Sequence, residues 1–341
     1  MNEIVTIGIP VFRAARYIRG ALESALGQTY SKIEVLVIDD GSDDDSVAVV
    51  QQVQQSHVRG HAVRLVVHEH NQGVASTRNE IIDKAGGSML YFMDADDVIR
   101  CDTIALLYAE MQSFDAEVVF GSYERIASNG QRQVYQYPTM HFDVADQLAA
   151  FAYRRYAGIQ ASACNILMRL KLLRDCQHRF VPADYWEDMV FTFDLVTLVS
   201  RAVLLPDVTY SYQCREGSLS SYQQRSNLPK SEVMRNVSTV GYLKRPSAVL
   251  EKKPYYAKRC LCVVMTDFYM ACYVLKRRKH IVPAVTAEEL KSMLAHPAPL
   301  SLIVAFPVAR FKNLAFFLLG KLPAKLCVAA VWVVGKMKKL I

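Results

Sequence analysis

The sequence predicts an α/β fold: a mostly parallel sheet flanked by helices, followed by a mainly helical C-terminal extension that is basic and apolar. Four short apolar segments alternate with segments of helical spacing in the first hundred residues, which is the pattern of a parallel sheet covered by helices. Acidic residues directly follow two of these segments, at the sheet edge where such folds bind ligands. A shift to basic composition in the last hundred residues predicts the extension.

The elements of the first hundred residues follow from apolar periodicity and turn signals. We expect strands over 4–9, 34–38, 63–67 and 89–93. We expect the intervening helices over 14–26, 46–55 and 75–85. Pro10 is expected to close the first strand, because proline cannot donate a ladder hydrogen bond.

The middle of the chain has a more mixed pattern. It predicts a strand over 118–123, helices over 145–156 and 189–199, and one or two strands over 201–212. Near 229–254 the composition becomes basic, which predicts a domain boundary. We therefore expect one domain over 1–235, with halves over 1–110 and 111–235, and a helical basic region over 236–341.

Composition excludes several classes of protein. The chain has 341 residues, of which 52% are hydrophobic and 21% charged, which excludes a disordered or collagen-like chain. No uninterrupted apolar run reaches the roughly 18 to 20 residues of a spanning helix. The first residues lack the basic start and apolar core of a signal peptide. Eight cysteines without a CxxC pair predict reduced thiols, so we expect a cytoplasmic protein.

The net charge of +7 hides an asymmetry along the chain. Residues 1–239 carry 22 Lys and Arg against 29 Asp and Glu, whereas residues 240–341 carry 18 against 4. This split predicts that the last hundred residues face an anionic partner.

The acidic cluster from Asp94 to Asp97 follows the fourth strand. Its three carboxylates repel one another unless a cation neutralises them, and the first and third share one side of an extended backbone, so they can reach one divalent ion and its ligand. The alternative is a solvated turn or a helix cap.

Two further polar junctions follow strands. Asp39 and Asp40 precede Gly41-Ser42, which is either part of a site or ordinary turn and cap chemistry. An EF-hand is excluded, because glycine is missing at position six and glutamate at position twelve. After the third strand, Gly73 would let the backbone approach a ligand and Arg78 could neutralise a phosphate or fix an acid. A turn with a surface arginine is the alternative.

These elements, in this order and spacing, resemble the family 2 glycosyltransferases, which are inverting enzymes of the GT-A fold that use nucleotide-sugar donors. The resemblance is continuous over about the first hundred residues, with weaker matches at 187–188 and 212–220. The matching residues are Ile9-Pro10-Val11, Tyr17-Ile18, Ser24, Gln28-Thr29-Tyr30, Glu34, Asp39-Asp40-Gly41-Ser42, Asn71-Gln72-Gly73, Ala75, Arg78-Asn79, Ala85-Gly86 and Asp94-Ala95-Asp96-Asp97.

The resemblance implies that 1–235 is a catalytic domain, with a nucleotide-binding half (1–110) and an acceptor half (111–235). It also implies roles for residues on the donor side. Pro10 and Asp39 would line the uracil pocket of a UDP-sugar, with Asp40 and Arg78 supporting the nucleotide. Asp94 would contact the ribose. Asp96, the last acid of the family's D-x-D signature, would ligate Mn²⁺ or Mg²⁺ bridging the two phosphates, where a divalent ion stabilises the leaving group.

The resemblance also implies an acid that takes the acceptor's hydroxyl proton. Asp188 is the expected base and Glu187 the alternative, because adjacent residues point in different directions. Trp186 offers either a face for sugar stacking or a core side chain. Arg215 is expected to close over the diphosphate, with an ordinary surface arginine as the alternative.

The first strand departs from the family pattern. Many members continue it as Pro-x-Tyr-Asn, whereas this chain has Pro10-Val11-Phe12-Arg13. This departure affects the contacts at the edge of the donor's base and leaves the fold unaffected. His68 and His70 have strand-like spacing without a third ligand, so no zinc site is predicted.

The C-terminal region interleaves short apolar blocks with lysines and arginines. Such a pattern is typical of amphipathic helices on an anionic bilayer. We expect this region to hold the enzyme on the inner face of the cell membrane, where the acceptor would be a glycan or a lipid-linked sugar. Nucleic acid is not expected as a partner, because exposed apolar blocks have no counterpart on a phosphate backbone. The alternative is helices that pack on the catalytic domain.

The sequence therefore predicts a metal-dependent inverting glycosyltransferase that extends a surface polysaccharide or cell-envelope glycan. Two rivals remain: a donor-binding module without catalysis, which would need no base, and a sugar nucleotidyltransferase, which would need a glycine-rich phosphate loop that the first strand lacks. A nicotinamide dehydrogenase is excluded by the missing GxGxxG.

Overall fold

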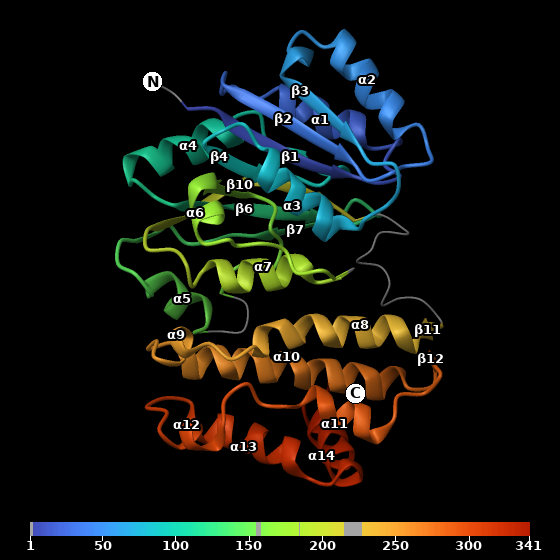
Figure 1. Ribbon diagram of the computed structural model, residues 1–341, viewed down its shortest axis with the longest axis vertical. Helices are drawn as coiled ribbons and strands as arrows, with labels where there is room; N and C mark the ends of the chain where they lie inside the picture. The colour runs from blue at the N-terminus through green and yellow to red at the C-terminus, as the bar shows by residue number, and fades with distance from the viewer. Residues whose placement is uncertain (1–2, 155–157, 184, 215–226) are drawn as a thin grey trace. The chain divides into compact units, whose positions relative to one another are not determined.

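The computed structural model describes residues 3–154, 158–183, 185–214 and 227–341 (Figure 1). The chain forms two compact units. Unit 1 comprises 1–148, 161–182 and 191–221, and unit 2 comprises 149–160, 183–190 and 222–341. Each unit is described separately, and the expected boundary between 235 and 236 stays a prediction.

The first half of unit 1 is a parallel sheet with strand order β3-β2-β1-β4. The strands are β1 (Val5–Val11), β2 (Ile33–Asp39), β3 (Val63–Val67) and β4 (Met89–Phe92). The connecting helices are α1 (Ile18–Leu26), α2 (Ser46–Ser56) and α3 (Val74–Lys84), with a 3-10 turn, η1 (Gly60–Ala62). Every strand and helix expected here is present, with shifts at the ends.

One expectation about β1 is wrong. Pro10 does not close the strand, because β1 continues to Val11 and Pro10 pairs with Ile38 of β2. The carbonyl of Gly8 faces β4, where it accepts the N–H of Met93. Residues two apart face the same neighbour, so Pro10 also faces the β4 side, beyond the last β1–β4 pair at Gly8. Its missing N–H therefore costs no ladder hydrogen bond.

The second half of the sheet is mixed. The order continues β4-β9-β6-β10-β5, with β7 on β6 and β8 on β10. These strands are β5 (Val98–Ile99), β6 (Val118–Ile126), β7 (Arg132–Tyr135), β8 (Met140–Phe142), β9 (Ile166–Arg169) and β10 (Ala202–Gln213). Segment 201–212, expected as one or two strands, is the single strand β10, which is parallel to β6, whereas β9 is antiparallel to β4 and β6.

Further helices complete this part of the chain. They are α4 (Thr103–Ser113), α5 (Gln147–Ala152), α6 (Leu170–Asp175) and α7 (Glu187–Leu195). Within unit 1, α3 packs on β1 and β2, and α4 packs on β6 and β10. Side chains such as Ile7, Leu36 and Phe92 are completely buried, as expected of strands with both faces covered. Each contributes about 1.5–3 kcal/mol to folding.

Unit 2 is helical, as the sequence predicts for the C-terminal region. Its helices are α8 (Lys230–Gly241), α9 (Ala248–Glu251), α10 (Tyr256–Arg277), α11 (Ala287–Met293), α12 (Leu300–Val304), α13 (Arg310–Lys321) and α14 (Ala324–Met337). A 3-10 turn, η3 (Tyr242–Lys244), follows α8, and β11 (Leu228–Pro229) pairs with β12 (Ile281–Val282).

Helix α10 is the centre of unit 2. It packs against α8, α11, α13 and α14 (Figure 1). A capping box formed by Thr286 and Glu289 starts α11, in agreement with the preference for Thr at this position. Within the described ranges, none of the helices combines the length and the hydropathy required to cross a bilayer.

Candidate functional site

The loops that follow β1 and β2 are joined by hydrogen bonds. The N–H of Arg13 donates to Oγ of Ser42 at 2.9 Å, and the N–H of Ala14 donates to Oγ of Ser46 at 2.8 Å. The Arg13 guanidinium forms an exposed ion pair with Asp43 at 2.7 Å, which contributes little to stability. Arg13, where the chain departs from the family pattern, therefore has its own local partner.

Asp39, the last residue of β2, is completely buried. Its Oδ1 accepts the N–H of Ser42 at 2.9 Å. Its Oδ2 is buried and has no hydrogen-bond partner among the described residues. A buried carboxylate oxygen without a partner carries a desolvation cost of several kcal/mol. This oxygen is therefore available to accept a hydrogen bond from a ligand at the end of the sheet.

Asp40 fixes the start of α3. Its Oδ1 accepts the N–H of Gln72 at 2.8 Å, and its Oδ2 accepts the N–H of Gly73 at 2.8 Å. Gly73 has a φ of +89°, which favours glycine. Asp40 is thus more than a turn residue, because it joins the end of β2 to the loop before α3.

His68 lies between two carboxylates. Its Nδ1 is 2.8 Å from Oδ1 of Asp40, and its Nε2 is 2.6 Å from Oε2 of Glu80. Burial lowers the pKa of His68, but the hydrogen bonds to Asp40 and Glu80 outweigh it and raise the pKa above its ordinary value. His68 therefore holds the Asp40 carboxylate in position through this hydrogen bond. The strand-like spacing of His68 and His70 predicted neither of these partners.

This arrangement predicts a pH-dependent contribution to stability. A histidine whose pKa is raised on folding stabilises the protein below its unfolded pKa of about 6.5, and the contribution is lost as pH rises through the raised pKa. His68→Gln should lower the free energy of unfolding by about 1.5–3 kcal/mol at low pH and by less at high pH. Urea denaturation of both proteins, at a pH below 6.5 and at a pH above the raised pKa, measures this difference in the free energy of unfolding. The exposed His61→Gln is the control, and a cost that does not change with pH would contradict the prediction.

Arg78 and Asp94 form an ion pair in which the arginine is buried and the aspartate is half-buried. Nη2 of Arg78 donates to Oδ1 of Asp94 at 2.9 Å, and the arginine side chain is 5% exposed. The guanidinium also lies 5.4 Å from the ring centroid of Phe180, within the range of a cation–π contact. The side chain of Asn79 exchanges two hydrogen bonds with the backbone of Phe180. Arg78 is therefore fixed in position and is not a mobile surface arginine.

The three aspartates that follow β4 lie in different environments. Asp97 is buried, and it accepts the hydroxyl of Tyr210 at 2.6 Å and the N–H of Gln213 at 2.7 Å. Burial, with the nearby charges of Asp94 and Asp96, raises the pKa of Asp97 to about 8. Asp96 is half-buried in the same loop. Repulsion among the three carboxylates is therefore reduced in two ways. Arg78 pairs with Asp94, and the raised pKa of Asp97 favours its neutral form.

Tyr210 is a site residue that sequence reasoning missed. Its hydroxyl donates to Asp97 and also accepts the N–H of Asp94 at 3.2 Å. It is buried on β10, more than a hundred residues beyond the acidic cluster. No local pattern distinguishes it from other strand tyrosines, because only the pairing of β10 in the mixed half of the sheet brings it to the cluster.

Unit 1 therefore places Pro10, Asp39, Asp40 and Asp94 at the carboxyl ends of β1, β2 and β4, and Arg78 of α3 pairs with Asp94. The other residues that the sequence predicts for the site do not belong to this part of unit 1. Glu187 and Asp188 form the first turn of α7 in unit 2, where Glu187 is buried and Asp188 is half-buried. Trp186 packs against the apolar core of unit 2, in agreement with the core alternative. Arg215 lies outside the described residues.

The described part of the chain contains no group of three or more His, Cys, Asp or Glu side chains arranged to hold a metal ion. A carboxylate such as Asp96 can nevertheless contribute to a site completed by a ligand, because Mg²⁺ is commonly held by one or two carboxylates together with substrate phosphates.

Comparison with known sequences places this site in a family. The model of glycosyl transferase family 2 matches residues 6–176, half of the chain. The glycosyltransferase GlyG of Streptococcus pneumoniae is 27% identical over 224 residues, which cover 64% of this chain and 73% of that protein. The Escherichia coli protein WfgD, named as a UDP-Glc:α-D-GlcNAc-diphosphoundecaprenol β-1,3-glucosyltransferase, is 29% identical over 128 residues, 38% of this chain and 49% of that protein.

Comparison with solved structures supports the fold. The S. aureus TarS fragment 1–349 in complex with UDP-GlcNAc aligns with a TM-score of 0.65 and 18% identity, covering 93% of this chain and 90% of that chain. The expected GT-A-like α/β fold, with a helical C-terminal part, is therefore confirmed.

Proposed function

This chain belongs to glycosyl transferase family 2, and on that premise we propose that it is an inverting enzyme that transfers a sugar from a UDP-sugar to a hydroxyl of a glycan or lipid-linked acceptor. The buried, partnerless Oδ2 of Asp39 carries the proposal. The uracil ring of UDP presents an imide N–H, which is the donor that this oxygen lacks. Pro10, which lies on β1 beside Ile38 of β2, would line the same pocket.

Asp40, Arg78 and Asp94 would support the rest of the nucleotide. Asp40 fixes the N–H groups of Gln72 and Gly73, and an added Cβ at Gly73 would meet no atom within 4 Å. The ligand can therefore approach the backbone closely at this point. Arg78 holds Asp94 by its Oδ1, and we propose that this orients the carboxylate toward the ribose.

Asp96 would hold Mn²⁺ or Mg²⁺ together with the diphosphate. Its carboxylate supplies the hard oxygen that these ions prefer. When bound, the ion neutralises charge that develops on the diphosphate leaving group. Arg215 would add a second positive charge to the diphosphate.

Asp188 would act as the general base, with Glu187 as the alternative. In the proposed step the acceptor oxygen forms a bond to the anomeric carbon as the bond from that carbon to the diphosphate oxygen breaks. The diphosphate leaves with the electron pair of that bond, and the acceptor's proton moves to the carboxylate. Attack opposite to the leaving group inverts the configuration.

The proposed acceptor is inferred from a named relative, and the proposed location in the cell is inferred from the charge of residues 240–341. The name of WfgD specifies a lipid-linked acceptor, and this relative supports a role in polysaccharide or cell-envelope glycan synthesis. The basic composition of 240–341 supports peripheral association with the anionic inner face of the cell membrane. A donor-binding module without catalysis is the second candidate; it would not depend on Asp188.

Calorimetric titration of UDP, with and without Mn²⁺, tests the donor class. We expect binding that strengthens with Mn²⁺. Asp39→Asn should weaken UDP binding by about tenfold to a hundredfold, because the amide keeps the acceptor for Ser42 and replaces the second oxygen by a donor. The exposed Asp143→Asn is the matched control. Equal UDP affinity in the Asp39→Asn and wild-type proteins would exclude the uracil assignment.

A further inference from the structure

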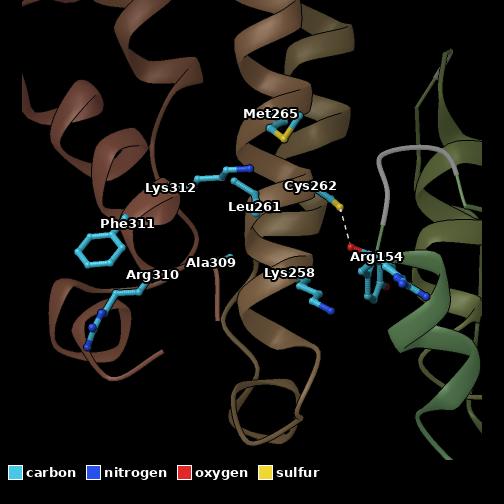
Figure 2. Close-up of a pocket in the computed structure, with 10 residues that line it drawn as sticks. Arg154, Lys258, Leu261, Cys262, Met265, Ala309, Arg310, Phe311 and Lys312 are labelled. Carbon is cyan, nitrogen blue, oxygen red and sulfur yellow. Dashed lines mark hydrogen bonds between the residues drawn. The ribbon is translucent and has the colours of Figure 1, made fainter. Parts of the chain in front are cut away.

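Unit 2 contains a cationic groove of about 600 Å³. Helix α10 contributes Lys258, Leu261, Cys262 and Met265. The end of α5 and the start of α13 lie on either side of α10 in Figure 2. The groove residues on these two segments are Tyr153 and Arg154, and Ala309, Arg310, Phe311 and Lys312. The sulfur of Cys262 lies 3.7 Å from the carbonyl oxygen of Tyr153, which joins α10 to the end of α5.

All charged side chains that line this groove are positive. Its residues include four cations, Arg154, Lys258, Arg310 and Lys312, and no acid. Within the described ranges of the chain, none of the four has a carboxylate within salt-bridge distance. Four cations that line one groove without counter-charges create a positive potential, which attracts an anion to the groove.

The edge of the groove is apolar. Phe311 is 77% exposed, although it lies between Arg310 and Lys312, and the Arg310 guanidinium lies 5.3 Å from its ring centroid. Leu261 and Met265 line the floor. A small soluble anion would interact with the cations but would not bury these apolar side chains. The combination suits an amphiphile with an anionic head and a hydrocarbon body.

Helix α14 shows the same combination. Cys327, Val331 and Gly335 form its buried side. On the opposite side, where a helix at a water surface carries polar residues, Leu326 and Met337 are 58% and 78% exposed. Residues 297–341, which contain α12, α13 and α14, carry seven Lys and Arg and no Asp or Glu.

We infer that the groove binds the phosphate headgroup of an anionic phospholipid at a bilayer surface, with Phe311 entering the acyl-chain boundary. Charge complementarity and the adjoining exposed apolar side chains favour this occupant. The inference deepens the proposed membrane association by naming the site and its ligand. It does not depend on donor chemistry, because all residues of the groove belong to unit 2 and none is assigned to the donor site.

Co-sedimentation of the full-length protein with vesicles tests the inference. The wild-type protein should bind vesicles of phosphatidylglycerol and phosphatidylcholine and should not bind phosphatidylcholine alone. The double variant Arg310→Ser/Lys312→Ser should lose about thirty-fold in vesicle affinity, because each cation near an anionic surface contributes to binding. Phe311→Ser should lower the affinity by about tenfold through lost apolar burial.

The matched control is Lys32→Ser/Lys171→Ser, which removes the same charge from two exposed positions of unit 1, outside the groove and outside 297–341. Its loss should be no more than about threefold. Equal losses in the two double variants would overturn the groove as a specific site. Wild-type protein that does not bind phosphatidylglycerol vesicles, even if it binds inorganic diphosphate in solution, would overturn the lipid assignment.

The UDP titration of each variant separates this inference from the proposed function. Unchanged UDP affinity in the groove variants, together with lost vesicle binding, supports the groove as an independent lipid site. Retained vesicle binding in a protein that binds no UDP would reject the donor proposal alone.

Discussion

Asp96→Asn is expected to lower sugar transfer by about a hundredfold to a thousandfold, the effect of removing one group that stabilises charge in a transition state. The proposed reason is that Asp96 would hold the ion at the diphosphate, because a carboxylate oxygen is a ligand that Mn²⁺ and Mg²⁺ prefer. Metal-dependent UDP binding should fall with it. Calorimetry with UDP and Mn²⁺, combined with a transfer assay, measures both quantities.

Asp143→Asn is the matched control for Asp96→Asn, because it removes one carboxylate from an exposed position of unit 1. It should leave both quantities unchanged. If Asp96→Asn retains wild-type affinity for UDP in the presence of Mn²⁺, the metal assignment is wrong. Melting temperature distinguishes a lost ligand from a lost fold, and we expect little change, since Asp96 is only half-buried.

Asp188→Asn is expected to lower transfer by about a hundredfold to ten-thousandfold while UDP binding stays intact. General-base catalysis contributes a factor of this size, and in the proposed mechanism the base contacts the acceptor and not the nucleotide. A transfer assay with saturating donor measures the first quantity, and UDP titration the second.

Glu187→Gln is the comparison for Asp188→Asn, because the two acids are adjacent in the first turn of α7. Glu187 is buried, whereas Asp188 is half-buried and accepts the N–H of Met189 at 2.6 Å. If Glu187→Gln abolishes transfer and Asp188→Asn does not, the base is Glu187. Full transfer in both variants would exclude this pair and would favour a base elsewhere or a binding module.

The parallel half of the sheet could be predicted because its information is local. Each strand from β1 to β4 is an apolar run next to a helix of regular spacing, and such units join in one way. Asp39, Asp40 and the cluster from Asp94 to Asp97 directly follow their strands, so the sheet edge that carries them was predictable. The alternating pattern fixes which residues come at the strand ends, independently of how the rest of the chain folds.

The mixed half of the sheet was harder to predict because its pairings join distant segments. Strand β9 has four residues, too few to show a period, and it inserts between β4 and β6. Pro10 was misjudged for the same reason: whether a proline ends a strand depends on the neighbour that its missing N–H would face, and β4 has ended at that point.

The sequence by itself determined the fold class, the family resemblance and the loops that carry the acids. Only the tertiary structure decided what each acid does. It paired Asp94 with Arg78, placed His68 between Asp40 and Glu80, and brought Tyr210 to Asp97. Hydrogen bonding and pKa depend on burial and on atoms within a few ångströms. Those atoms come from residues far apart in the chain, so no local pattern could specify them.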